Sequence, residues 1–183
     1  MIAVIHELVK TLDQGYYDEI FEVVDLTKVT CTCGVTGDFI MYGTYKRTVK
    51  NDSDTFQLIT RRVKCQSCGC THAILPAALV PYQQQTTDVQ KKILLYPLGS
   101  DELEELMTKN LGITEFDVGR IRKRFKQHWE QRLKTMGMDL NFNLFDLIQS
   151  SFAWFNRQFL QIRRGNICKI FIPTCDEFKS GLT

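Results

Sequence analysis

Four of the seven cysteines form two closely spaced pairs, each followed at once by a glycine. The first pair reads Cys-Thr-Cys-Gly from Cys31, and the second reads Cys-Gln-Ser-Cys-Gly from Cys65. Two cysteines on a tight turn can direct both sulfur atoms at one ion, and the glycine lets the backbone bend. We therefore predict one zinc site with the ligands Cys31, Cys33, Cys65 and Cys68. Because four thiolates fill a tetrahedral coordination sphere, this zinc is expected to be structural and not catalytic.

Other interpretations of the cysteines stay open at this point. Buried free thiols would need no metal, because cysteine packs like a small hydrophobic residue. Cys70 and His72 follow the second pair and are alternative ligands, although we expect His72 to be a partly buried residue on a strand. A redox role is disfavoured, since thiol oxidoreductases place Cys-x-x-Cys at the start of a helix in a βαβ unit. The distant Cys168 and Cys175 are expected to be packing residues.

A run of basic residues, Arg-Ile-Arg-Lys-Arg-Phe-Lys, occupies positions 120–126 and contains no acid. On a helix this run makes a dense positive face, which favours an anionic partner. The surrounding apolar residues have the offsets of a helix-turn-helix over 102–126, with Gly112 at the turn, where a positive φ is needed. We expect Val118, Ile121 and Phe125 to face inward and the start of the second helix to enter a DNA major groove.

The outward positions of this helix are the predicted DNA contacts. Arg120 is the preferred base reader, because a guanidinium can pair with both acceptors of guanine. The other cations are expected to contact phosphates, which contributes affinity that falls with salt. Two arginines of the preceding hairpin add a second basic group. The predicted DNA-binding residues are Thr114, Glu115, Arg120, Lys123, Arg124, Lys126, Arg61 and Arg62. The alternative is an ordinary helical hairpin with a solvated cationic face.

A β-hairpin is predicted to connect the two cysteine pairs. Residues 39–49 and 55–64 are rich in β-branched and aromatic residues, and the turn-prone sequence at 51–54 separates them. Residues 71–76 predict a third short strand that ends at a proline. Together these segments predict a small zinc ribbon over residues 28–82.

Helical patterns flank this ribbon. Apolar positions from Ile5 to Leu12 predict a short helix, and a second helical segment is predicted to end near Asp25. After the ribbon, Ser100 and Thr114 predict the N-caps of a helix over 102–110 and of a long helix to about residue 136. Further along, the pattern predicts an amphipathic helix over 143–162 and a strand over 167–172.

The predicted fold class is α+β, with a small β zinc ribbon followed by an α-helical domain that contains the helix-turn-helix. Three parts are expected: an acidic N-terminal helical segment (1–27), the zinc ribbon (28–82) and the helical domain (88–183). With 183 residues, 44% hydrophobic and 24% charged, the composition is that of a folded globular protein. No apolar run predicts a membrane span or a secretion signal, so we expect a cytoplasmic protein.

The motifs occur in a characteristic order: Cys-x-Cys-Gly, a hairpin, Arg-Arg-Val-Lys-Cys-x-x-Cys-Gly, Thr-His-Ala-Ile-Leu-Pro-x-x-Leu-Val-Pro-Tyr, and a helix-turn-helix. This order resembles the zinc-binding front end of bacterial insertion-sequence transposases, and resembles still more a family of short bacterial proteins associated with mobile elements. The resemblance covers about residues 28–135. It implies DNA binding, with zinc held by the two cysteine pairs and DNA read by the helix from Thr114. The RNase H-like catalytic domain of a complete transposase has no room here, so transposase activity is not expected.

We therefore expect a non-enzymatic DNA-binding protein that is an accessory or regulatory factor of a mobile element. Its expected partner is double-stranded DNA, with a transposase or a second copy of the chain as a further partner, and without a membrane or a small-molecule substrate. One alternative is a magnesium-dependent nuclease or transposase fragment that uses Asp139, Asp146, Asp176 or Glu177. Another is a protein-interaction module built on the ribbon and the aromatic helix around Trp154.

Overall fold

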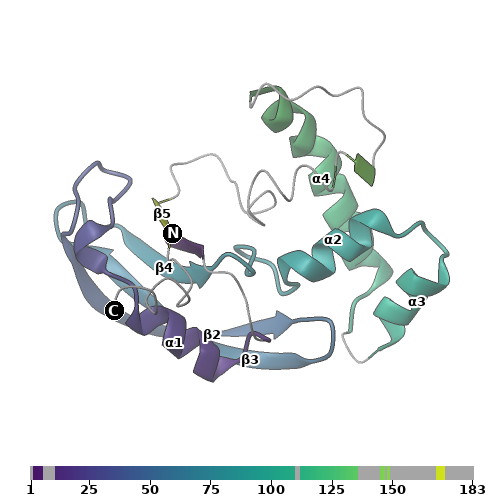
Figure 1. The fold of residues 1–183 in the computed structure, drawn as a ribbon, viewed down its shortest axis with the longest axis horizontal. Helices are drawn as coiled ribbons and strands as arrows, with labels where there is room; N and C mark the ends of the chain where they lie inside the picture. Colours follow the sequence, from purple (N-terminus) through teal and green to yellow (C-terminus); the bar gives the residue numbers. More distant parts are fainter. Residues whose placement is uncertain are drawn as a thin grey trace, which may run out of the picture. The chain divides into compact units, whose positions relative to one another are not determined.

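The computed structural model describes residues 2–5, 11–109, 112–135, 145–146, 148 and 168–171 (Figure 1). Its elements follow one another as β1 (Ile2–Ile5), α1 (Gln14–Glu22), the 3-10 helix η1 (Leu26–Lys28), β2 (Phe39–Lys50), β3 (Thr55–Cys65), β4 (Thr71–Pro76), α2 (Thr87–Leu95), α3 (Asp101–Thr108), α4 (Glu115–Thr135) and β5 (Cys168–Phe171). The predicted mixed α and β class is confirmed. Within these described ranges, every helix is too short or too polar to cross a membrane.

The chain divides into two compact units, each made of segments that are distant in the sequence. The first unit comprises residues 1–47, 57–77 and 163–183, and the second comprises residues 48–56 and 78–162. The first unit therefore contains both cysteine pairs and the N-terminal segment, and the second contains α2, α3 and α4.

The sheet has the strand order β2-β3-β4-β1-β5. Strand β4 is antiparallel to β3, with Val63 opposite His72, while β1 is parallel to both β4 and β5. The predicted hairpin, the third strand and the C-terminal strand are all confirmed. The turn of the hairpin forms as its composition predicts, because the Asn51 side chain accepts hydrogen bonds from the backbone N–H groups of Ser53 and Asp54.

Strand β1 was not predicted; the apolar pattern predicted a helix from Ile5 to Leu12, of which residues 6–10 lie outside the described residues and Ile5 is extended. Residues 2–5 are extended and lie between β4 and β5, and the side chains of Ile2 and Val4 are fully buried. A short apolar run between two parallel neighbours is typical of a buried strand, and four residues are too few to distinguish it from a helix by periodicity. The second predicted helical segment is α1, which ends at Glu22 and so confirms that part of the prediction.

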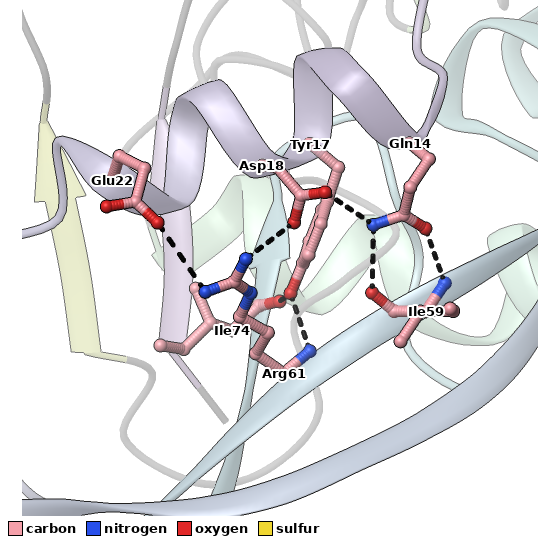
Figure 2. Close-up of polar contacts among 7 residues, drawn as sticks. All are labelled: Gln14, Tyr17, Asp18, Glu22, Ile59, Arg61 and Ile74. Carbon is pink, nitrogen blue, oxygen red and sulfur yellow. Dashed lines mark hydrogen bonds and ion pairs between the residues drawn. The ribbon is translucent and has the colours of Figure 1, made fainter.

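Helix α1 packs on the sheet where β4 leaves β3 to pair with β1 (Figure 2). The Tyr17 hydroxyl lies at this divergence: it accepts a hydrogen bond from the Arg61 N–H at 2.8 Å and donates one to the Ile74 carbonyl at 3.0 Å. The Gln14 side chain likewise accepts from the Ile59 N–H and donates to the Ile59 carbonyl. Side chains of α1 therefore satisfy backbone groups that would otherwise lack a strand partner.

Replacing Tyr17 by phenylalanine is expected to destabilise the protein and to change its response to alkali. The variant leaves the Arg61 N–H and the Ile74 carbonyl without their partner, which costs about 1–3 kcal/mol. Burial raises the pKa of Tyr17 from 10.0 to about 12. The folded state therefore favours the neutral phenol, and this contribution is complete below about pH 10 and is lost as the pH rises towards 12.

Urea unfolding at about pH 8 and about pH 11 measures both effects. The free energy of unfolding of the wild type should fall between these pH values, and Tyr17→Phe should start lower and fall less. Equal stability of the two proteins at the lower pH would contradict the bridging role of the hydroxyl.

The second unit has its core between three helices. Its buried residues come from α2, α3, the turn before α4, α4 itself and the short helical segment near residue 148. They are Val89, Ile93, Leu94, Leu103, Leu106, Ile113, Val118, Ile121, Phe125 and Ile148. The inward positions predicted for the second helix are thus confirmed. Both predicted N-caps are confirmed as well, because Ser100 Oγ accepts from the Leu103 N–H and Thr114 Oγ1 from the Asp117 N–H.

Several sequence-based predictions fall outside the described residues. They include most of the helix over 143–162, although residues 145, 146 and 148 are helical. The aromatic cluster around Trp154 and the carboxylates of Asp139, Asp176 and Glu177 also lie outside them, as does Cys175. Asp146 is described, and its side chain is exposed.

Candidate metal centre and nucleic-acid interface

Two loops of similar design present the cysteine pairs. The first lies between η1 and β2, and the second follows the end of β3. In each loop the glycine N–H donates to the carbonyl of the first cysteine, from Gly34 to Cys31 and from Gly69 to Cys65, both at 2.9 Å. Gly34 has a φ of 92° and Gly69 a φ of 72°, in the left-handed region that other residues resist. The glycines therefore close the turns that direct the sulfur atoms to one point.

The four sulfur atoms converge as predicted. All four Sγ atoms lie within 4.8 Å of one another, and two of the separations are 3.6 Å (Cys31 to Cys68) and 3.8 Å (Cys33 to Cys65). In a tetrahedral site with Zn–S bonds of about 2.3 Å, neighbouring sulfurs are about 3.8 Å apart, whereas a disulfide would bring them to about 2.0 Å. The cluster is therefore spaced for a metal ion and could bind one.

The local environment favours ionisation of one of these thiols. Desolvation raises the pKa of Cys31, but hydrogen bonds from the backbone N–H of Cys33 and from the neighbouring thiols outweigh it and lower the pKa to about 6. Cysteine must be deprotonated to bind a metal, so the shift favours metal binding near neutral pH. Cys31 and Cys65 are buried, whereas Cys33 and Cys68 reach the surface, which leaves a path by which an ion can enter.

The two alternative ligands, Cys70 and His72, differ in their positions relative to the four sulfur atoms. Cys70 is exposed and does not belong to the cluster of four sulfurs. His72 is buried on β4, with its Nε2 3.3 Å from Cys31 Sγ and its ring edge-to-face with Phe39. His72 thus lies beside a predicted ligand as a hydrogen-bond partner of its sulfur, a role typical of residues that orient metal ligands. The sequence alone did not indicate this contact, because the two residues are 41 positions apart.

The turn between α3 and α4 has the geometry expected for Gly112. Its φ is +53°, and its carbonyl accepts a hydrogen bond of 2.8 Å from Lys50 Nζ. A second anchor joins α4 to α2, because the Arg122 guanidinium donates to the carbonyls of Ile93 and Tyr96. The last carbonyls of a helix have no partner within the helix, and at the end of α2 Arg122 supplies one. Arg122 therefore differs from the other cations of the basic run in having a structural role.

One exposed stripe of α4 combines an aromatic ring, a glycine and two cations. Phe116, Gly119, Arg120 and Lys123 are spaced i, i+3, i+4 and i+7, which places them on one face of a helix. Phe116 is 76% exposed, and a Cβ at Gly119 would meet no atom within 4 Å. Phe116 and Gly119 were not among the predicted DNA contacts, although the same helical spacing that predicted the basic contacts includes them.

Arg120 is oriented by the residues that begin the helix. Its Nη2 donates to Asp117 Oδ1 at 2.7 Å, and its guanidinium lies 5.9 Å from the centre of the Phe116 ring. The other carboxylate oxygen of Asp117 accepts from the N–H and hydroxyl of Thr114, which completes a capping box. A guanidinium has five donors, so the ion pair leaves further donors for another acceptor.

The other predicted DNA contacts have different surroundings. Thr114, Glu115 and Lys123 are exposed, Arg124 is half-buried, and the side chain of Lys126 lies outside the described part of α4.

Arg61 and Arg62, the two hairpin arginines predicted to contact DNA, have different partners in the structure. Arg61 pairs with Asp18 at 2.9 Å and with Glu22 at 3.5 Å (Figure 2). Its guanidinium also covers the ring of Phe21. The acids of the N-terminal segment thus hold Arg61 against α1, and we assign this residue to the attachment of that helix. Arg62 follows it and points to the opposite face of the strand.

Comparison with known proteins identifies one domain family. Residues 30–109 match a family described as "Domain of unknown function (DUF6431)". No curated protein and no solved structure matches the chain. The chain is similar to this family over a segment that carries both cysteine pairs, the hairpin, β4, α2 and α3.

Proposed function

We propose that this chain is a non-enzymatic, sequence-specific DNA-binding protein in which α3 and α4 form a helix-turn-helix and the cysteine cluster holds a structural zinc. The observation that carries the proposal is the exposed stripe of α4, which places a base-reading guanidinium beside an open ring on a helix whose other side is buried.

The packing of α3 and α4 supports the helix-turn-helix. Leu103 and Leu106 of α3 share one core with Val118 and Ile121 of α4, and the left-handed Gly112 turns the chain between them. Helix α2 closes this core, so that α2 and α3 together support the exposed half of α4. In this arrangement the second helix of the motif is the one that enters the major groove.

The exposed stripe offers the chemistry that base readout needs. Arg120 can donate to O6 and N7 of guanine, and the Phe116 ring can contact the methyl group of thymine. Gly119 has no side chain, so the helix backbone can approach the groove closely at that position. Lys123 lies one turn further along and is suited to a phosphate. Glu115, at the start of the helix, can accept from the amino group of cytosine.

Zinc is the metal that the donor set favours. Four thiolates are soft ligands, and a set of four cysteines is typical of tetrahedral structural zinc sites. No coordination position would remain for water, so the ion would stabilise the loops of the first unit without activating a substrate.

The biological setting rests on the order of the motifs. The paired cysteines, the hairpin, the Thr-His-Ala-Ile-Leu-Pro strand and the helix pair resemble the binding modules of mobile elements. We therefore assign the protein to the accessory or regulatory factors of such an element, acting on duplex DNA in the cytoplasm with a transposase or a second copy as partner.

Selection from a random duplex library, followed by titration of the selected duplex at several salt concentrations, tests this function. The wild type should bind with an affinity that falls steeply with salt, because phosphate contacts release counterions. Lys123→Gln should weaken binding to all sequences and reduce the salt slope by about 0.9, the value for one phosphate on duplex DNA.

The matched control is Lys28→Gln, which removes the same charge from a lysine whose side chain is 83% exposed in the first unit. It should leave the affinity and the slope near those of the wild type. Failure of the wild type to bind any duplex at low salt would overturn the proposed function.

A further inference from the structure

A second cationic surface lies on the hairpin, on the face of the sheet opposite to α1. Strand residues alternate between faces, so Arg62 and Lys64 face away from Arg61, which α1 engages. The Arg62 guanidinium lies 5.7 Å from the centre of the Tyr42 ring and 5.9 Å from that of Tyr45, and Lys64 Nζ lies 5.3 Å from Tyr42. These contacts gather two tyrosines and two cations on one face.

A bend in β2 makes this grouping possible. Tyr42 and Tyr45 are three residues apart, and strict alternation would place them on opposite faces. Gly43, which lies between them, has a φ of +82°. A glycine in this conformation is typical of a β-bulge, which inserts one residue and restores the next tyrosine to the same face. We call the surface formed by Tyr42, Tyr45, Arg62 and Lys64 the tyrosine–cation face.

Both cations of this face lie against aromatic rings. Within the part of the chain that the structure describes, Arg62 and Lys64 contact aromatic rings and have no carboxylate partner. The Tyr42 side chain remains 46% exposed. The face therefore combines positive charge with an open aromatic ring, which suits a ligand that is anionic and also carries flat rings.

We propose that the tyrosine–cation face binds single-stranded nucleic acid, with the cations on phosphates and the tyrosine rings stacked on bases. Exposed rings on a sheet, interleaved with cations, are suited to unstacked bases. A duplex keeps its bases stacked, and so would offer these rings no partner. This site is distinct from the stripe on α4. Single-strand binding by the tyrosine–cation face and duplex binding by α4 are therefore independent proposals, and each has its own test.

Fluorescence anisotropy with a labelled thymidine 20-mer, which forms no duplex with itself, tests the proposal on the full zinc-loaded chain. The wild type should bind this strand, and should bind an abasic strand of the same length about tenfold more weakly, because stacking on a base is lost. Absence of binding to the thymidine strand at low salt, or equal affinity for both strands, would overturn the proposal.

Substitutions locate the binding to this face. Tyr42→Leu keeps an apolar side chain but removes the ring, and should weaken binding of the thymidine strand about tenfold. Lys64→Gln should reduce the salt slope by about 0.7, the value for one phosphate on a single strand. The control is Lys46→Gln. Lys46 is exposed on β2, the strand that carries both tyrosines, but it directly follows Tyr45 and so points away from the tyrosine–cation face. Equal effects of the control and Lys64→Gln would assign the binding to net charge and overturn the proposal.

Photocrosslinking of the unmodified protein to a strand that contains bromodeoxyuridine provides a measurement that does not depend on any variant's folding. The crosslinked peptide should contain Tyr42 or Tyr45. A crosslink confined to α4 would place single-strand binding on the helix and overturn the proposal, while leaving the duplex-binding function to its own test.

Discussion

Cys65→Ser is expected to abolish zinc binding and to unfold the first unit. Cys65 is fully buried, and its sulfur lies 3.8 Å from that of Cys33 within the cluster of four. Structural zinc in small metal-binding peptides contributes about 10–16 kcal/mol, which is as large as the whole stability of a typical domain, about 5–15 kcal/mol. Metal analysis should find about one zinc per wild-type chain and much less in the variant, and circular dichroism should show lost strand content.

Cys70→Ser is the matched control for this substitution. Cys70 lies in the same loop, but it is exposed and outside the sulfur cluster. This variant should keep its zinc and its melting temperature. Replacement of zinc by Co²⁺ should give the visible absorption of a tetrahedral thiolate site in the wild type and in Cys70→Ser. A zinc-free Cys65→Ser protein that melts like the wild type would contradict a structural metal.

Arg120→Ala is expected to weaken binding of the selected duplex by about 1–3 kcal/mol and to relax specificity at one base pair. The reason is geometric, since the planar guanidinium presents a rigid fork of N–H donors to the two acceptors of guanine. The variant itself should stay folded, because the Asp117 carboxylate keeps its hydrogen bonds from the N–H and hydroxyl of Thr114. Titration of the selected duplex and of its single-base variants measures both effects.

Arg120→Lys separates charge from base recognition at the same position. Lysine keeps the positive charge but lacks the planar fork. Compared with Arg120→Ala, the Arg120→Lys variant should therefore regain affinity for unrelated duplexes but not discrimination at the one base pair. If Arg120→Ala weakened all duplexes equally, with its specificity unchanged, Arg120 would be a phosphate contact and not a base reader.

Local features of the fold could be predicted because local residues decide them. The hairpin strands, their Asn51 turn and the caps at Ser100 and Thr114 depend on side chains within a few positions of one another. The left-handed conformation of Gly112 was predictable for the same reason, since φ is a property of one residue. The two glycine-flanked cysteine pairs were predicted to converge because each pair needs a partner to complete a tetrahedron.

Contacts between distant segments could not be predicted in the same way. A four-residue apolar run is compatible with a helix or a strand, and only pairing with β4 and with β5, far along the chain, makes residues 2–5 a strand. Likewise, neighbouring arginines look equivalent in the sequence. Packing of α1 on one face of β3 pairs Arg61 with acids and leaves Arg62 among tyrosines.

The sequence by itself thus determined which residues can bind a metal, which segments turn, and where α3 and α4 begin, because these properties depend on residue type and short spacing. Only the tertiary structure decided which cations are neutralised, which thiol is most easily ionised and which rings stay open. Each of these properties depends on the charges and atoms that folding brings within a few ångströms, and such neighbours are not encoded in any local pattern.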